Sequence, residues 1–174
     1  MIDEIARRLG VERWRKKDGA EQAHVASASV VLVKPQSYMN ESGGPIARVA
    51  AWWKGRPEDV LVVVDDLDLP FERLRMRANG GSGGHNGLKS VIEHLGEDFP
   101  RLRIGIGRNA EDDAIDRVLS HFSADEERRL VAVIEAAADG VMRWLESGVV
   151  DAMNYVNAWR PKEDAPVSDQ VVSE

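Results

Sequence analysis

Two uninterrupted apolar runs rich in β-branched residues restrict the fold of this chain more than any other feature. They read SVVLVKP over residues 29–35 and VLVVVDD over residues 60–66. Such runs are typical of strands that helices cover on both faces, because neither face of the strand then meets water. Between them, Ile46, Val49 and Trp53 follow the spacing of a helix that Gly55 ends. Strands that alternate with helices predict an α/β fold.

Further patterns along the chain support the same fold class. Residues 73–77 (RLRMR) and 101–107 (RLRIGIG) alternate as strands do. Apolar residues at helical spacing predict one helix near the beginning of the chain and another after the glycine-rich stretch. A long helix is expected to open at Ser123, where Glu126 completes a capping box. We therefore expect one mixed, mostly parallel sheet with helices on both faces.

The length of the chain suits a single domain. Its 174 residues are enough to bury one hydrophobic core. We expect this domain to span residues 1–160. Residues 161–174 are polar and acidic and follow neither the helical nor the strand period, so we expect them to form a disordered tail.

The composition argues against several classes of protein. The chain has no cysteine, so it has neither a disulfide framework nor cysteine-ligated zinc. No apolar run approaches the roughly 18 residues of a membrane span. Residues 1–10 also lack the apolar centre of a signal peptide. We therefore expect a cytoplasmic protein that does not enter membranes.

The charge of the chain is unevenly distributed. The formal net charge is −7, yet residues 71–108 carry seven Lys or Arg against four Asp or Glu. Residues 109–174 carry six basic against fifteen acidic residues. A local basic face can bind phosphate groups even on an acidic protein, although a solvated mixed surface explains the same counts.

The glycine-rich stretch GGSGGHNGLK covers residues 80–89, inside the basic block. It lacks the lysine and hydroxyl that directly follow a glycine in a P-loop, and it lacks the spacing of a dinucleotide-binding loop, so it indicates a mononucleotide site only weakly. Glycines do let backbone N–H groups approach an anion, and the following helix adds the positive end of its dipole. His85 and Asn86 lie where that helix begins.

Polar residues also follow both buried strands. Asp65, Asp66 and Asp68 come at the carboxyl end of the second, which is the edge where open α/β sheets bind ligands. A carboxylate there can orient a histidine, hold a metal ion or cap a turn. After the first strand, Tyr38 could stack on a base and Asn40 offers hydrogen-bond donors and an acceptor. The alternative is that Tyr38 belongs to the core and Asn40 to a turn.

Three segments together resemble the bacterial peptidyl-tRNA hydrolase family. They are KPQSYMNESG, VVVDDLDLPFERLRMRANGGSGGHNGLKS and FPRLRIGIGR, and the resemblance runs from the first helix to about Pro161. It implies hydrolysis of the ester between a peptide and the 3′ ribose of tRNA, which recycles tRNA from aborted translation. It also implies a monomer that uses no metal and no cofactor, whose partner is the 3′ end and acceptor stem of peptidyl-tRNA.

The resemblance assigns roles to individual residues. Asp65 matches the aspartate that holds the general-base histidine in its productive tautomer. Three residues match positions that line the family's cleft: Asn40, His85 and Asn86. Tyr38 matches an aromatic position that contacts the end of the substrate. Three residues match basic positions that meet tRNA phosphates: Arg75, Arg77 and Arg103.

The chain departs from the family in one respect. The family's general-base histidine lies in a Thr-Arg-His-Asn segment near the N-terminus, after a strand ending in Gly-Asn-Pro-Gly, and residues 1–174 contain neither. His24, His94 and His121 are expected to be structural or surface residues. Our interpretation is that an N-terminal segment is missing and that this chain by itself is inactive. The alternatives are a non-catalytic relative that binds tRNA or RNA, and a metal-dependent anion- or nucleotide-binding enzyme that uses the glycine loop.

Overall fold

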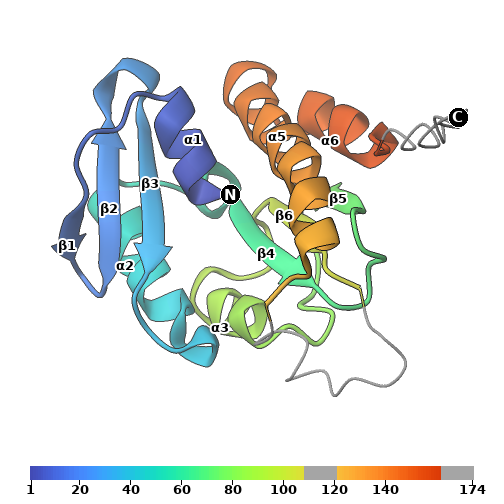
Figure 1. Cartoon of the computed structure of the whole chain (residues 1–174). Helices are drawn as coiled ribbons and strands as arrows, with labels where there is room; N and C mark the ends of the chain where they lie inside the picture. Colours follow the sequence, from blue (N-terminus) through green and yellow to red (C-terminus); the bar gives the residue numbers. More distant parts are fainter. Residues whose placement is uncertain (108–120, 162–174) are drawn as a thin grey trace, which may run out of the picture.

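The computed structural model describes residues 1–107 and 121–161 (Figure 1). The expected disordered tail, apart from Pro161, lies outside these residues. The helices and strands follow in this order: α1 (Ile2–Arg8), β1 (Arg15–Lys17), β2 (Ala20–Val25), β3 (Val30–Pro35), α2 (Gly43–Trp52), β4 (Val62–Asp66), β5 (Leu74–Arg77), α3 (Asn86–Leu95), β6 (Arg101–Gly105), α5 (Ala124–Ser147) and α6 (Val149–Ala158). Three short 3₁₀ turns are η1 (Ala26–Ala28), η2 (Met39–Glu41) and η3 (Pro57–Asp59).

The α/β class is confirmed, but the expectation of one mostly parallel sheet is wrong. The described strands form two sheets of three strands, in the orders β1-β2-β3 and β4-β6-β5. The first is entirely antiparallel, and in the second only β4 and β6 run parallel. The first sheet is antiparallel because its turns are short: Asp18 and Gly19, both with positive φ, join β1 to β2.

Helices cover both faces of the second sheet, as expected. On one face, Met76 and Leu102 pack with Val133 and Ala137 of α5 in a core that also takes in α1 and α6. On the other face, Leu88 and Val91 of α3 pack with Phe99 and with two partly buried valines of β4, Val62 and Val64. Figure 1 shows α5 and α6 beside one another over this sheet, with α3 on the side away from them. The glycine loop thus reaches the sheet on its α3 face.

The sequence patterns did not predict helix α6, which fixes the outer edge of β5. In the order β4-β6-β5, β5 is an edge strand. The side-chain amide of Asn157 on α6 accepts a hydrogen bond from the backbone N–H of Met76 at 2.9 Å. The same amide donates to the Met76 carbonyl at 3.1 Å. One side chain therefore satisfies both backbone groups of one edge residue.

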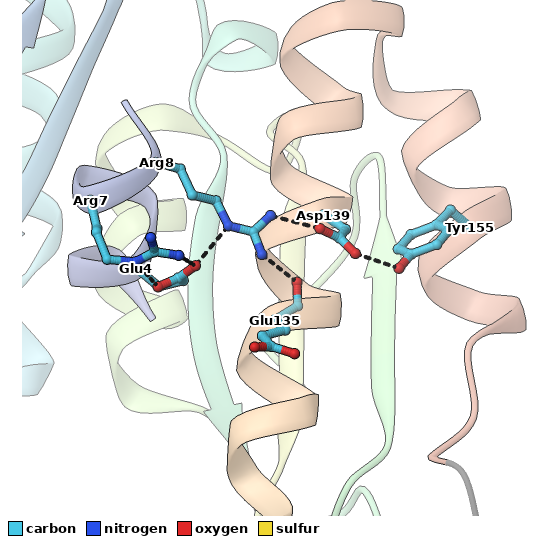
Figure 2. A network of polar contacts seen from close by, with 6 residues as sticks. All are labelled: Glu4, Arg7, Arg8, Glu135, Asp139 and Tyr155. Atoms are coloured by element: carbon cyan, nitrogen blue, oxygen red, sulfur yellow. Dashed lines mark hydrogen bonds and ion pairs between the residues drawn. The ribbon is translucent and has the colours of Figure 1, made fainter. Parts of the chain in front are cut away.

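A polar network joins α1 to α5 and α6 (Figure 2). Arg8 donates to Glu4 at 2.7 Å and to Asp139 of α5 at 2.6 Å. Asp139 also accepts a hydrogen bond from the Tyr155 hydroxyl of α6 at 3.0 Å. Arg8 and Asp139 thus hold three helices together around the edge of the core.

Acid is expected to weaken this network through Glu4. Hydrogen bonds from Arg7 and Arg8 lower the pKa of the Glu4 carboxyl from 4.5 to about 2. The folded state therefore favours the charged form, whose stabilising contribution is complete above about pH 4.5 and lost as the pH falls toward 2. Glu4→Gln should flatten the pH dependence of the unfolding free energy over this interval, measured by urea unfolding. Glu146→Gln, a replacement at an exposed position of α5, should leave this pH dependence unchanged. The same pH dependence of the unfolding free energy in both variants would contradict the assignment.

Candidate active site

Asp65 and His85 lie together at the carboxyl end of β4. His85 is the N-cap of α3, and its Nδ1 accepts a hydrogen bond from the backbone N–H of Leu88 at 3.1 Å. The other ring nitrogen, Nε2, lies 3.6 Å from Oδ1 of Asp65. The imidazole is 13% exposed and the Asp65 side chain 33%, so the pair meets solvent mainly through the carboxylate.

Asp65 is held in its charged form. The ring N–H of His85 lowers the pKa of the Asp65 carboxyl, and this outweighs burial, which alone would raise it. At 3.6 Å the contact is longer than a normal hydrogen bond, so it is a weak one. The carboxylate keeps the capacity to accept stronger hydrogen bonds from another group.

Asp66, the neighbour of Asp65, caps the turn. Its Oδ1 accepts the backbone N–H of Asp68 at 2.8 Å, and its Oδ2 pairs with Arg103 at 2.9 Å. The sequence left open which carboxylate of this cluster would cap and which would face a ligand. The structure gives the cap to Asp66 and turns Asp65 toward His85. The catalytic role expected of Asp65 stays a prediction.

Two arginines of β6 bind backbone carbonyls of the glycine loop. Arg103 donates to the carbonyl of Ser82 at 2.8 Å, and Arg101 bonds the carbonyls of Gly80 and Gly81. Gly83 has a φ of +56°, and a Cβ on it would lie 3.1 Å from the Arg103 guanidinium. The sequence did not reveal this arrangement, because arginines that alternate with Leu102 and Ile104 read as an outward basic face.

The remaining residues expected in the cleft come from two segments. Asn40 lies on η2, which packs against α3. Met39, beside it, lies so close to Gly87 that a Cβ there would be 2.6 Å from the methionine sulfur. Asn86 is the exposed first residue of α3, and Tyr38 is 80% exposed. Tyr38 is therefore not a core residue, and its side chain is free to meet a ligand.

The three arginines expected to meet tRNA have different surroundings. Arg75 and Arg77 are exposed on β5, and Arg75 pairs in register with Arg103 on β6, so the side chains share one face. The Arg103 side chain, by contrast, is 11% exposed and already paired with Asp66. A pocket of about 270 Å³ lies at the β5 edge, and its lining includes Arg73, Arg75, Arg77 and Asn157. The phosphate contacts of all three arginines stay a prediction.

The other histidines do not reach Asp65. All four histidines lie in the part of the chain that the structure describes, and of these only His85 is within ion-pair distance of Asp65. His24 stacks on Trp53, with ring centroids 4.4 Å apart, and His94 Nδ1 lies 2.8 Å from the Ser90 carbonyl. Residues 1–107 and 121–161 also contain no group of three or more His, Cys, Asp or Glu placed to hold a metal ion.

Comparison with known proteins decides the family. A family model described as peptidyl-tRNA hydrolase matches residues 1–165. The chain belongs to the peptidyl-tRNA hydrolase family. A peptidyl-tRNA hydrolase of Mycobacterium marinum is 44% identical over 164 residues, covering 91% of this chain and 86% of the relative. One of Synechococcus is 43% identical, covering 90% and 72%.

A solved structure agrees with this assignment. The peptidyl-tRNA hydrolase of Acinetobacter baumannii superimposes with a TM-score of 0.85 at 29% identity, over 92% of this chain and 84% of that one. The resemblance read from the sequence is thus confirmed at the level of family, fold and enzyme class: the chain is a hydrolase of the peptidyl-tRNA hydrolase family. In the described residues, every helix is too short or too polar to cross a membrane.

Proposed function

We propose that this chain acts on peptidyl-tRNA and that Asp65 and His85 mark the place where its ester is cleaved. The observation that carries the proposal is their pairing at the carboxyl end of β4, in a chain whose relatives are peptidyl-tRNA hydrolases. Hydrolysis breaks the bond between the peptide carbonyl and the 3′ oxygen of the ribose. The peptide leaves as a carboxylate and the tRNA keeps a free hydroxyl.

Each site residue has a role in this proposal. Asp65, charged at neutral pH, orients the histidine that takes a proton from water. The amides of Asn40 and Asn86 bind the peptide backbone, the terminal nucleotide or the attacking water, since an amide both donates and accepts hydrogen bonds. Tyr38, with its exposed ring, contacts the end of the substrate. We also propose that the protein is monomeric and cytoplasmic.

His85 is poorly placed to be the general base itself. Its Nδ1 already accepts the Leu88 N–H, which puts the ring proton on Nε2, facing Asp65. Neither nitrogen then has a free lone pair for a water proton. We therefore propose that His85 positions the Asp65 carboxylate, and that the base is an imidazole other than that of His85. This geometry also favours the alternative of a tRNA-binding relative without catalysis.

Residues 1–174 are expected to cleave peptidyl-tRNA no faster than background, and added imidazole should restore part of the rate. Imidazole can occupy the free side of Asp65 and act as the base that the side chains do not provide. Release of peptide from N-acetyl-aminoacyl-tRNA measures this, with the Mycobacterium marinum relative as the positive control. Turnover without imidazole that His85→Gln abolishes would make His85 the base. Tight tRNA binding with no imidazole effect would support the non-catalytic alternative.

We propose that tRNA phosphates lie along the basic edge formed by Arg75 and Arg77. Both side chains are exposed on the same face of an edge strand. The pocket beside them adds Arg73, so three cations at alternate positions of one segment border a hollow of about 270 Å³. Phosphates of the acceptor stem are the anions that the substrate would bring to this edge.

Replacing Arg75 and Arg77 with glutamine is expected to weaken tRNA binding and flatten its salt dependence. Each lost phosphate contact should reduce the slope of log K against log salt by about 0.7–0.9, because fewer counterions are released. Filter binding of uncharged tRNA at several salt concentrations measures the slope. The matched control replaces Arg15 and Lys16 with glutamine; both are exposed cations on β1, in the other sheet. The same loss of slope in both pairs would mean that tRNA is held by overall charge and not at β5.

A further inference from the structure

Arg101 is a fully buried cation whose partners are carbonyl groups. Its relative exposure is 1%, and burial lowers the pKa of its guanidinium. Its guanidinium donates five hydrogen bonds, and all five acceptors are backbone carbonyl oxygens, those of Gly80, Gly81, Glu97 and Phe99. The centre of the Phe99 ring lies 4.0 Å from the guanidinium carbon. A buried charge is unfavourable unless its hydrogen bonds are complete, and five donors with five contacts meet that condition.

The oxygens that Arg101 binds come from the two ends of one segment. Gly80 and Gly81 precede α3, whereas Glu97 and Phe99 follow it. The backbone adds one link between the same ends, because the Gly80 N–H donates to the Glu97 carbonyl at 3.3 Å. The guanidinium therefore joins the two ends of segment 80–99, and His85 and Asn86 lie within this segment.

We infer that Arg101 is a positioning residue for the candidate site: it clips the two ends of segment 80–99 together and thereby fixes the His85 imidazole against Asp65. A guanidinium suits this task because its five donors form a rigid plane that reaches several carbonyls at once, whereas lysine offers three donors on one atom. Arg103 continues the arrangement by linking Ser82 of the loop to Asp66. The inference rests on the proposed function only in treating the Asp65–His85 pair as an active site.

Arg101→Lys, which keeps the charge and loses the planar donors, tests the inference. The His85 ring N–H holds the pKa of Asp65 below its ordinary value, so a displaced loop should raise it toward that value. Titration followed by NMR of the carboxyl carbons measures this change. Glu4 serves as an internal control, because its pKa of about 2 should stay the same in the variant. Arg48→Lys is the matched control, because Arg48 also binds a carbonyl, that of Asp18. An unchanged pKa of Asp65 in folded Arg101→Lys would overturn the inference.

A second measurement needs no substitution. If Arg101 closes the segment as one unit, the protected amides of Gly80 and His85 should exchange with solvent through the same opening reaction in the unaltered chain. Native-state hydrogen exchange in low denaturant resolves the two amides. Independent opening would overturn the inference even if Arg101→Lys failed to fold. Both readouts are geometric, so absence of imidazole-dependent cleavage of peptidyl-tRNA would refute the proposed function and leave Arg101 as the residue that joins the two ends of segment 80–99.

Discussion

Asp65→Asn is expected to abolish the imidazole-dependent cleavage of peptidyl-tRNA while leaving tRNA binding unchanged. Asparagine has the shape of aspartate, but it carries no charge to stabilise an imidazolium and does not select the productive tautomer of the base. The equivalent replacement in the serine-protease triad lowers kcat about 10⁴-fold. There the base is a side chain of the enzyme, so we take this value as the upper limit of the loss in rate expected with added imidazole. Peptide release with and without imidazole measures the loss, and filter binding measures the affinity for tRNA.

The control for this replacement lies in the loop that follows β4. Asp68→Asn removes an equal charge three residues later, where the carboxylate is not within ion-pair distance of His85. It is expected to leave the imidazole-dependent rate unchanged. If Asp65→Asn kept the full imidazole-dependent rate, Asp65 would not be the residue that orients the base, and the mechanism proposed above would be wrong.

Gly43→Ala is expected to cause a large loss of stability near the site. Gly43 opens α2, and its N–H donates to the Ser90 hydroxyl of α3 at 3.0 Å. A Cβ at this position would lie 2.1 Å from the Ser90 carbonyl oxygen, which is backbone and cannot rotate away. The two helices must separate, and overpacking of this kind costs about 1–3 kcal/mol. The separation would also move η2, with Asn40, away from α3.

The next residue gives a matched control. A Cβ on Gly44 would lie 3.3 Å from the flexible end of the Arg48 side chain and 3.9 Å from His94, so it meets no backbone atom within contact distance. Gly44→Ala should therefore leave the midpoint of urea unfolding close to that of the unchanged chain, while Gly43→Ala lowers it. Equal midpoints for the two variants would show that α2 and α3 are less tightly packed than the structure indicates.

Local signals predicted the elements, whereas contacts between distant segments escaped prediction. The Ser123 and Glu126 capping box opens α5 as expected, because both partners lie within one turn. The Asp-Gly pair at residues 18–19 could have revealed the antiparallel hairpin of the first sheet, since this dipeptide is the strongest short hairpin signal. Helix α6 was missed because it begins immediately after the single residue Gly148 that ends α5.

The same distinction between local signals and contacts of distant segments applies to the candidate site. The sequence places Asp65 at the end of a strand and His85 at the beginning of a helix, and both positions are correct. It could not show that Arg103 pairs with Asp66, 37 residues away, because the alternating pattern of β6 indicates only which residues share a face. Arg101 escaped for the same reason. Burial of a charged side chain depends on the loop that folds over it, and the period of a strand carries no information about that loop.

The amide of Asn157 has a consequence for the behaviour of the protein at high concentration. Edge strands with unpaired backbone groups are templates on which strands of other molecules add, and such addition leads to aggregation. Asn157 occupies the N–H and the C=O of Met76, in the middle of β5, so it behaves as a strand one residue long. A second chain that approached this edge would have to displace the amide before it could form a ladder. Helix α6 therefore protects the colloidal stability of the protein through one side chain.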